Sequence, residues 1–494
     1  MMFNSINFII FFVATFCLFY ATPIKYRWLV LLLASSIFYA SLVPYYLLLV
    51  YGVILTSYLV GLAMDRQAGV KRKIMLWLGI TGAAAPLLFY KYLNFFQDNI
   101  NTLANALHWN YSGAMLHFIL PIGLSFYTFQ AISYLVEIYW GKQKPERHLG
   151  IYSLFILFFP QILAGPIARP QSLLPQLNSD YAFNGDEISN GLKLMLWGFF
   201  KKLVIADRLS IAVNHVYGAT ADASGVTLLI STVLFAFQIY CDFSGYSDIA
   251  IGAAQVFGFK LTNNFNRPYF SKSIAEFWNR WHISLSSWMR DYIYIPLGGS
   301  RVSKWKWARN ILITFLVSGF WHGANWTFIF WGLLNGSYIV ISRYTEKPRK
   351  FIVNLIHLDK HPQIHKLLRI SFTFSLITIT WIFFRAASLH EALYILQKIA
   401  IDVPLHLLNM HLPHLDDYRL LASQLGMGIY NLTIAIGSIA VMEFVHLLER
   451  NRPMSDTLRN KPLWIRWSFY YAIILAIALF GAYHGQAEFI YFKF

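Results

Sequence analysis

Apolar runs of about twenty residues recur along the whole chain and restrict what it can fold into. A run of about this length is what one helical crossing of a membrane requires. Inside the hydrocarbon core no water satisfies the backbone, so a crossing segment closes its own hydrogen bonds as a helix. The 494-residue chain is 57% hydrophobic and only 13% charged, which is too little charge to cover soluble domains. The sequence therefore predicts an all-α polytopic membrane protein.

Counted by length, the apolar runs predict roughly 11–14 transmembrane and re-entrant helices. The predicted spans lie near residues 5–22, 27–42, 43–64, 74–90, 115–140, 188–206, 226–258, 367–388, 429–448 and 467–486. Another stretch, 158–170, is apolar but is interrupted by three prolines and a glycine. Irregular backbone at membrane depth is tolerated only inside the protein or along a cavity. We therefore expect a re-entrant or half-buried segment there.

Lysine and arginine gather in the connectors between the apolar runs. The net charge is +17, and basic residues that flank spans are typical of cytoplasmic loops rather than of a nucleic-acid surface. Residues 260–309 hold nine of them against two acidic residues. We expect this segment in the cytoplasm and residues 91–114 and 389–428 on the opposite side, with the chain in the inner (cytoplasmic) membrane of the cell.

Residues 272–291 have the pattern of an amphipathic helix. At about 100° per residue their large apolar side chains share one stripe, while Glu276 and Arg280 lie on the opposite face. The stripe comprises Ile274, Phe277, Trp278, Trp281, Leu285, Trp288 and Met289. Such a helix is predicted to lie along the membrane interface on the cytoplasmic side. His282 falls at the border of the stripe, where it can face either lipid or water.

His322 lies between two glycines in an otherwise uncharged run. Basic flanks at Arg309 and Arg343 are so close together that they predict a hairpin of two short helices, with residues 319–325 near its inner turn. A titratable side chain at such depth indicates a functional site. The alternative is a hydrogen-bonded structural histidine, and the sequence leaves both interpretations open.

The residues around His322 fit acyl transfer from a thioester to a hydroxyl. That reaction needs a base that is neutral near pH 7, and desolvation in an apolar hairpin disfavours a charged imidazole. Asn325 and the indole N–H groups of Trp321 and Trp326 are donors that can orient the imidazole or stabilise an oxyanion. The basic loop offers charge for the phosphates of an anionic donor such as a coenzyme A thioester.

Two acidic residues, Asp242 and Asp248, interrupt a long apolar run. They are either proton sites of a secondary transporter or hydrogen-bonded anchors that face the protein interior. A transporter predicts inverted repeats, and we find none in the sequence. Both cysteines, Cys17 and Cys241, lie in apolar stretches. Zinc, hydrolase and nucleotide-hydrolysis motifs are absent, so no bound metal or permanent cofactor is expected.

Two motifs whose histidines are forty residues apart resemble those of the membrane-bound O-acyltransferase family. They are Arg280-Trp-His-Ile-Ser-Leu-Ser-Ser-Trp288 and Trp321-His-Gly-Ala-Asn-Trp326, and the similarity is strongest to the bacterial polysaccharide-acetylating branch. The resemblance implies His322 as the catalytic histidine and His282 as a second functional position, supported by Arg280 and Asp242. It also implies a ring of helices around a central tunnel. We expect a single membrane-embedded domain over residues 1–494, with its catalytic core at about 115–345.

The resemblance implies an O-acyltransferase that moves an acyl group, foremost acetyl, from cytosolic acetyl-CoA toward hydroxyls of an extracytoplasmic polysaccharide such as alginate. D-alanyl or lipid acyl transfer, a proton-coupled transporter and a non-catalytic scaffold are the alternatives. The expected partners are the lipid bilayer, the acyl donor and a periplasmic SGNH-type acetyltransferase or other polysaccharide-biosynthesis proteins. Nucleic acid is not expected.

The end of the chain, Phe489-Ile-Tyr-Phe-Lys-Phe494, is rich in aromatic residues. An aromatic belt that anchors the last helix at the interface explains this pattern. The alternative is an acyl relay through Tyr491, since the tail resembles the tyrosine-bearing C-terminal motif of small companion proteins in the D-alanylating branch. A phenol needs a base to become nucleophilic, and His322 is the expected base.

Overall fold

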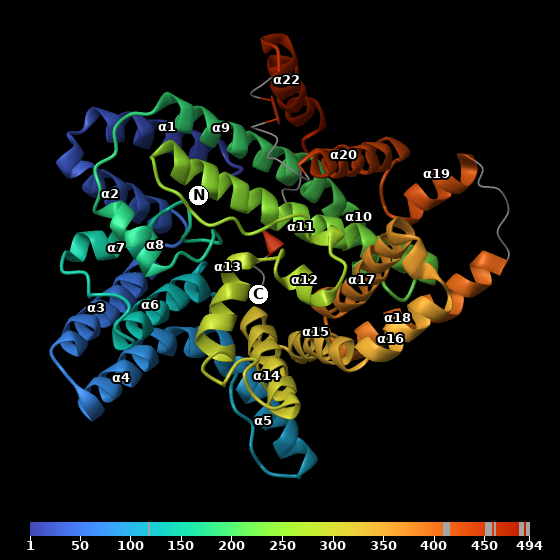
Figure 1. Ribbon diagram of the computed structural model, residues 1–494, viewed down its shortest axis with the longest axis horizontal. Helices are drawn as coiled ribbons and strands as arrows, with labels where there is room; N and C mark the ends of the chain where they lie inside the picture. The colour runs from blue at the N-terminus through green and yellow to red at the C-terminus, as the bar shows by residue number, and fades with distance from the viewer. Residues whose placement is uncertain (117–118, 409–414, 450–456, 459–460, 484–488, 491–494) are drawn as a thin grey trace. The chain divides into compact units, whose positions relative to one another are not determined.

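The structure is a computed structural model that describes residues 1–116, 119–408, 415–449, 457–458, 461–483 and 489–490. Within these residues every regular element is a helix, which confirms the predicted all-α class (Figure 1). The chain divides into two compact units. Unit 1 comprises Met1–Met195 and Tyr246–Asn263, and unit 2 comprises Leu196–Gly245 and Asn264–Phe494.

Unit 1 is built from the N-terminal helices. They are α1 (Ile6–Ala21), α2 (Arg27–Ala40), α3 (Tyr46–Asp65), α4 (Gly69–Leu87), α5 (Leu93–Ala106), α6 (Leu124–Tyr139), α7 (Leu149–Leu157), α8 (Pro170–Leu177) and most of α9 (Gly185–Phe199). Helices α3, α4 and α6 pack against one another (Figure 1). A Cβ added at Gly61 of α3 would stand 2.8 Å from Tyr134 of α6, and one at Gly79 of α4 would stand 2.8 Å from Leu135. Small residues at these crossings allow the close approach that membrane helices need.

The proline-interrupted stretch lies inside unit 1, between α7 and α8. Phe158, Phe159 and Ile162 are completely buried. The backbone N–H of Phe159 donates to the Ser35 hydroxyl at 3.0 Å, and the Gln161 amide donates to the carbonyl of Phe155 at 2.8 Å. Side chains thus replace hydrogen bonds that a helix would have made. The segment is irregular as predicted, and these residues are more completely buried than the half-buried segment expected.

Six helices within the described residues are long and apolar enough to cross a membrane, by length and composition. They are Tyr46–Asp65, Gly69–Ala106, Gly225–Val256, Pro362–Arg385, Ile429–Leu448 and Leu463–Phe480. The larger number predicted from the sequence also counts shorter apolar helices such as α1, which has 16 residues. Helix α1 is shorter than each of the six, of which the shortest, Leu463–Phe480, has 18 residues.

Two segments predicted as connections on the extracytoplasmic side are largely helical instead. Helix α5 continues α4 through a π-helix at Leu88–Tyr92, and the region after residue 389 contains α18 (Leu389–Leu408) and α19 (Leu415–Gln424). In α18 the buried side chains of Ala392 and Ile395 are three residues apart, so they share one helix face. An amphipathic period within a polar-looking stretch explains why these helices were missed.

Unit 2 contains the remaining elements. They are the π-helix Phe200–Ala206, α10 (Asp207–Gly218), the first part of α11 (Gly225–Val256), α12 (Ile274–Trp278), α13 (Ile283–Met289), α14 (Lys304–His322), α15 (Trp326–Tyr344), α16 (Glu346–Leu355), α17 (Pro362–Arg385), α18, α19, α20 (Ile429–Leu448) and α22 (Leu463–Phe480). Helix α15 packs against both α14 and α17. These three helices carry the residues around His322.

Candidate active site

The predicted hairpin around His322 is formed by α14 and α15. Both helices have 19 residues, so they are longer than the two short helices expected. A Cβ added at Gly319 of α14 would stand 2.3 Å from the carbonyl oxygen of Phe328, and one at Gly332 of α15 would stand 2.2 Å from that of Phe315. The two backbones therefore touch at a pair of glycines. This contact fixes the end of α14, where His322 is the last residue.

His322 is enclosed by aromatic rings. Its imidazole is 3% exposed, and its ring centroid lies 4.8 Å from Trp321, 4.9 Å from Trp331 on α15 and 5.4 Å from Phe384 on α17. All three contacts are edge-on. None of these three rings carries a charge. We call His322 and these three rings the aromatic cage.

His282 lies at a break between two short helices. Instead of one helix over residues 272–291, the structure has α12 and α13, and His282 between them adopts a left-handed conformation with φ of 42°. Asn264 stabilises the break, because its carbonyl accepts from the N–H of Ile283 at 2.9 Å and its side chain accepts from that of Ser284 at 3.2 Å. The prediction of a continuous amphipathic helix was wrong here.

The apolar stripe of this segment faces protein rather than lipid. All of its members are at most 8% exposed, and Trp281 packs against Trp381 of α17 at 5.1 Å between ring centroids. On the other face Arg280 pairs with Glu276 at 2.7 Å, and both side chains are about one quarter exposed. The periodicity thus predicted the two faces correctly. The prediction that the apolar face lies in the membrane interface was wrong, because this face packs against protein.

His282 is completely buried, so it faces neither lipid nor water. Its ring centroid lies 4.6 Å from that of Phe243 on α11. Burial lowers the pKa of His282 to about 3. The ring of Trp321 lies 6.1 Å from that of His282 and 4.8 Å from that of His322. The structure therefore brings both predicted histidines into ring contact with Trp321.

Two other predicted donors take different positions. The side chain of Asn325 accepts from the N–H of Thr327 at 3.0 Å and caps α15, and its amide donates to the carbonyl of Ala387 at 3.3 Å. Trp326 is 53% exposed, so it does not belong to the buried cage. The indole N–H of Trp331 is instead buried and has no hydrogen-bond partner among the described residues. Sequence reasoning missed Trp331 because only the fold brings α15 to the imidazole.

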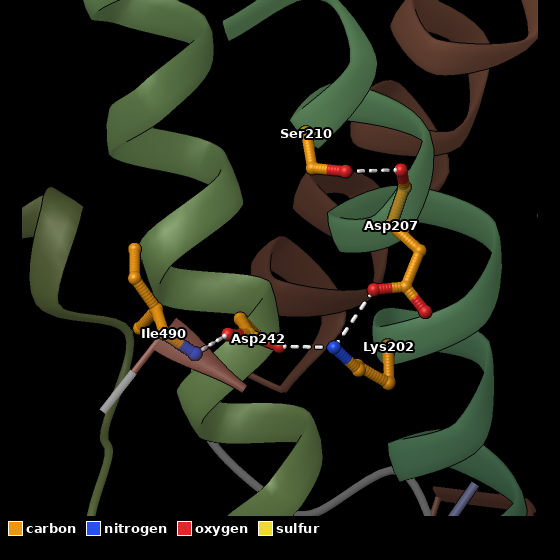
Figure 2. Close-up of polar contacts among 5 residues, drawn as sticks. All are labelled: Lys202, Asp207, Ser210, Asp242 and Ile490. Carbon is orange, nitrogen blue, oxygen red and sulfur yellow. Dashed lines mark hydrogen bonds and ion pairs between the residues drawn. The ribbon is translucent and has the colours of Figure 1, made fainter. Parts of the chain in front are cut away.

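Asp242 belongs to a buried ionic cluster (Figure 2). One carboxylate oxygen accepts from the Lys202 ammonium at 2.7 Å and the other from the backbone N–H of Ile490 at 2.7 Å. The same ammonium lies 2.7 Å from Asp207. Of the two roles considered for Asp242, this is the hydrogen-bonded anchor. Lys202 and Asp207 were missed, although charged residues within an apolar run were the signal that could have found them.

The tail was predicted to hold either an anchor or a relay. Tyr491 lies outside the described residues, so its role stays a prediction. Phe489 and Ile490 are described and are 4% and 7% exposed. The ring of Phe489 lies 5.7 Å from that of Phe243, which is the ring that contacts His282.

Comparison with known proteins identifies the fold and the site together. Residues 148–389, which include both histidine motifs, match the model of the membrane-bound O-acyltransferase family. The chain is 39% identical over 396 residues to a probable alginate O-acetylase of Pseudomonas putida, covering 79% of each protein. The chain belongs to the membrane-bound O-acyltransferase family. It is accordingly a multi-pass membrane protein and an acyltransferase.

Other members of the family show the range of chemistry around this chain. It is 38% identical over 399 residues to a peptidoglycan O-acetyltransferase of Helicobacter pylori, covering 75% of this chain and 72% of the relative. It is 33% identical over 260 residues to a teichoic acid D-alanyltransferase of Streptococcus thermophilus, covering 49% and 61%. The resemblance inferred from the two motifs is thus confirmed at the level of the family.

Proposed function

We propose that this membrane-bound O-acyltransferase moves an acetyl group from cytosolic acetyl-CoA toward hydroxyls of an extracytoplasmic polysaccharide. The observation that carries the proposal is the buried, uncharged cage around His322 in a chain whose O-acetylating relatives match over three quarters of its length. The inner membrane is the location that gives access to both substrates. A periplasmic SGNH-type acetyltransferase is the partner that would complete the transfer to the polysaccharide.

In the proposed reaction His322 is the general base. Its neutral imidazole takes the proton of the acceptor hydroxyl while that oxygen attacks the thioester carbonyl carbon. A carbon–oxygen bond forms, and the carbonyl electron pair moves to the oxygen. When this pair returns, the carbon–sulfur bond breaks and the thiol leaves with the proton from the imidazolium. His322 is then neutral again, so protons and electrons balance.

The cage supplies a donor for the charge that develops on the carbonyl oxygen. The N–H of Trp331 is buried and uncommitted among the described residues, and its ring is 4.9 Å from that of His322. A preorganised donor in a site without water stabilises an oxyanion without the cost of reorganisation. Asn325 supports the site indirectly, because it fixes the start of α15 five residues before Trp331.

D-alanyl transfer is the second candidate, since the teichoic acid D-alanyltransferase of Streptococcus thermophilus is a relative that matches 49% of this chain. The same base serves both reactions, because each moves an acyl group from a carrier thioester to a hydroxyl. A proton-coupled transporter fits less well, because both oxygens of Asp242 are engaged in the ionic cluster.

Replacement of His322 tests the proposed function. We expect His322→Ala to insert normally and to lose acyl transfer by about two to four orders of magnitude, the range for a general base. Acetyl groups on the polysaccharide, measured in cells that lack the native gene, give the readout. The control is His446→Gln, because His446 is another buried histidine in unit 2 but bonds to Tyr240 and Glu443. Near-normal acetylation in His322→Ala would exclude this residue as the base.

Labelling of the basic segment tests the side from which the donor enters. Trp305 lies among exposed basic residues and is 76% exposed itself. We expect Trp305→Cys, in a background without Cys17 and Cys241, to react with an impermeant thiol reagent only after the cells are opened. Trp109→Cys is the matched control, since Trp109 is 60% exposed and lies in a segment predicted outside. Reaction of position 305 in intact cells would contradict a cytosolic donor.

A further inference from the structure

The last two described residues of the chain are buried, although the helix before them is not. In the apolar window of α22 only 6% of the residues are buried. Just after α22, the N–H of Ala482 donates to the carbonyl of Leu203 at 3.0 Å, in the π-helix Phe200–Ala206. Phe489 and Ile490 are then 4% and 7% exposed. Ala482, Phe489 and Ile490 are therefore held by specific contacts inside unit 2.

The ionic cluster is shaped by the π-helix. A π-helix pairs residues five apart through its backbone, and Lys202 and Asp207 are five apart at its end. Their side chains meet at 2.7 Å, with exposures of 7% and 1%. The Ser210 hydroxyl donates to the backbone carbonyl of Asp207 at 2.7 Å, within the first turn of α10 (Figure 2). The Lys202 ammonium is thereby placed where it also reaches Asp242 on α11.

Asp242 binds the backbone of the tail rather than one of its side chains. Its second oxygen accepts the N–H of Ile490 at 2.7 Å (Figure 2). A bond to the backbone fixes which residue of the tail stands at this point, whatever side chain it carries. A hydrogen bond to a charged acceptor shifts the equilibrium between the docked and the undocked tail by about ten- to a hundredfold. The contact is strong enough to determine whether the tail is docked.

A continuous series of ring contacts leads from the tail to the histidines. Phe489 lies 5.7 Å from Phe243, and Phe243 lies 4.6 Å from His282. Trp321 then lies 6.1 Å from His282 and 4.8 Å from His322. When the tail leaves, the wall behind His282 loses a buried ring. The docked tail is thus part of the support of the proposed active site.

We propose that Lys202, Asp207 and Asp242 form a latch that docks Phe489 and Ile490, the described part of the C-terminal tail, against the wall of the proposed active site. Asp242 is the positioning residue, and acyl transfer depends on the docked tail. The dependence on acyl transfer rests on the proposed function, whereas the docking itself does not. Burial of three charged groups seldom adds stability over apolar residues of the same size, so a role in positioning explains the cluster better than a role in stability.

Removal of the Asp242 carboxylate opens the latch but does not leave the Lys202 ammonium unpaired, because Lys202 keeps Asp207 as its counter-ion. The reporter is Ile490→Cys, which keeps the backbone N–H, in a background without Cys17 and Cys241. We expect N-ethylmaleimide to label this cysteine about ten- to a hundredfold faster when Asp242→Leu is added. Asp242→Asn, whose amide oxygen still accepts the N–H, keeps the reporter protected. Tyr483→Cys, at a position that is 47% exposed, is the control and reacts equally in all backgrounds.

A change in the tail itself tests the link to activity. Ile490→Pro removes the donor N–H and leaves the ionic cluster untouched, whereas Ile490→Val keeps the N–H. We expect the proline variant to lose acyl transfer by about 10- to 100-fold, the cost of slight misplacement near a reacting centre, with unchanged abundance and thermal stability. The valine variant should stay close to the native rate.

The outcomes separate the latch from the proposed chemistry. In His322→Ala the reporter at position 490 should stay protected although transfer is lost. Equal labelling with and without Asp242 would overturn the latch, whatever the enzyme does. Full activity of Ile490→Pro would overturn the positioning role. Retained activity of His322→Ala would reject the proposed base but leave the labelling result to decide on docking.

Discussion

Two buried polar sites in unit 2 handle charge in opposite ways. Around His322 the neighbouring rings of Trp321, Trp331 and Phe384 offer no counter-charge. Around Lys202 two carboxylates approach to 2.7 Å each. The first site surrounds its imidazole with uncharged rings, while the second holds one lysine ammonium between two carboxylates. Both devices avoid an unpaired buried ion, which is the one arrangement that burial penalises severely.

The contrast shows how the same fold can serve chemistry and positioning. A neutral imidazole packed against aromatic rings is suited to accept a proton in the proposed reaction. A cluster of paired ionic groups is better suited to fix geometry, because each charge is held by a partner at 2.7 Å. We therefore expect the aromatic cage and the ionic cluster to respond differently when one charge is lost or gained.

The largest effect is expected in the ionic cluster. Lys202→Met leaves Asp207 and Asp242 buried without their shared cation. Loss of one member of a buried ion pair costs about 3–5 kcal/mol, and the thermal stability of the protein in detergent should fall accordingly. The triple variant Lys202→Met, Asp207→Leu, Asp242→Leu should recover that stability and yet lack acyl transfer. Unchanged melting of Lys202→Met would show that Lys202 does not balance these carboxylates.

A smaller effect is expected in the cage. Trp331→Phe keeps the ring beside His322 and removes only its N–H. If this N–H stabilises the oxyanion, acyl transfer should fall by about 100-fold without a change in stability. Trp381→Phe is the matched control, because the N–H of Trp381 is equally buried and lacks a partner among the described residues. Equal losses in the two variants would indicate a packing effect and remove Trp331 from the reaction.

Much of the fold was predictable because it depends on local apolar patterns. The all-helical class, the buried irregular stretch at 158–170 and the hairpin of α14 and α15 all follow from run length, prolines and basic flanks. The break at His282 was not predictable, because it depends on hydrogen bonds that Asn264, eighteen residues earlier in the chain, accepts from Ile283 and Ser284. A periodic pattern cannot show whether an apolar face meets lipid or another helix, and here it meets protein.

The site was predictable only in part, for a similar reason. Both histidines were identified from sequence because imidazoles are conspicuous in apolar runs. Their ring neighbours Trp331, Phe384 and Phe243 were not, since aromatic residues are abundant in this chain and only helix packing selects these three. Lys202 and Asp207 were visible as charges in an apolar run, but their link to Asp242 needed the structure.

The smallest effect concerns the second histidine and tests whether its surroundings really exclude charge. Burial lowers the pKa of His282 from 6.5 to about 3 in the folded protein. Below pH 6.5 the unfolded chain therefore binds a proton that the folded chain does not, so the stability from this group is complete above 6.5 and is lost as the pH falls toward 3. Between pH 7 and pH 5.5 this amounts to about 1 kcal/mol. His282→Asn is the matched variant, because asparagine tolerates the left-handed backbone at this position and does not titrate. The free energy of unfolding in detergent should decline less steeply with falling pH in the variant than in the native protein. Equal declines of the unfolding free energy in the two proteins would mean that His282 takes up a proton in the folded state. The uncharged surroundings would then be limited to His322 and would not include His282.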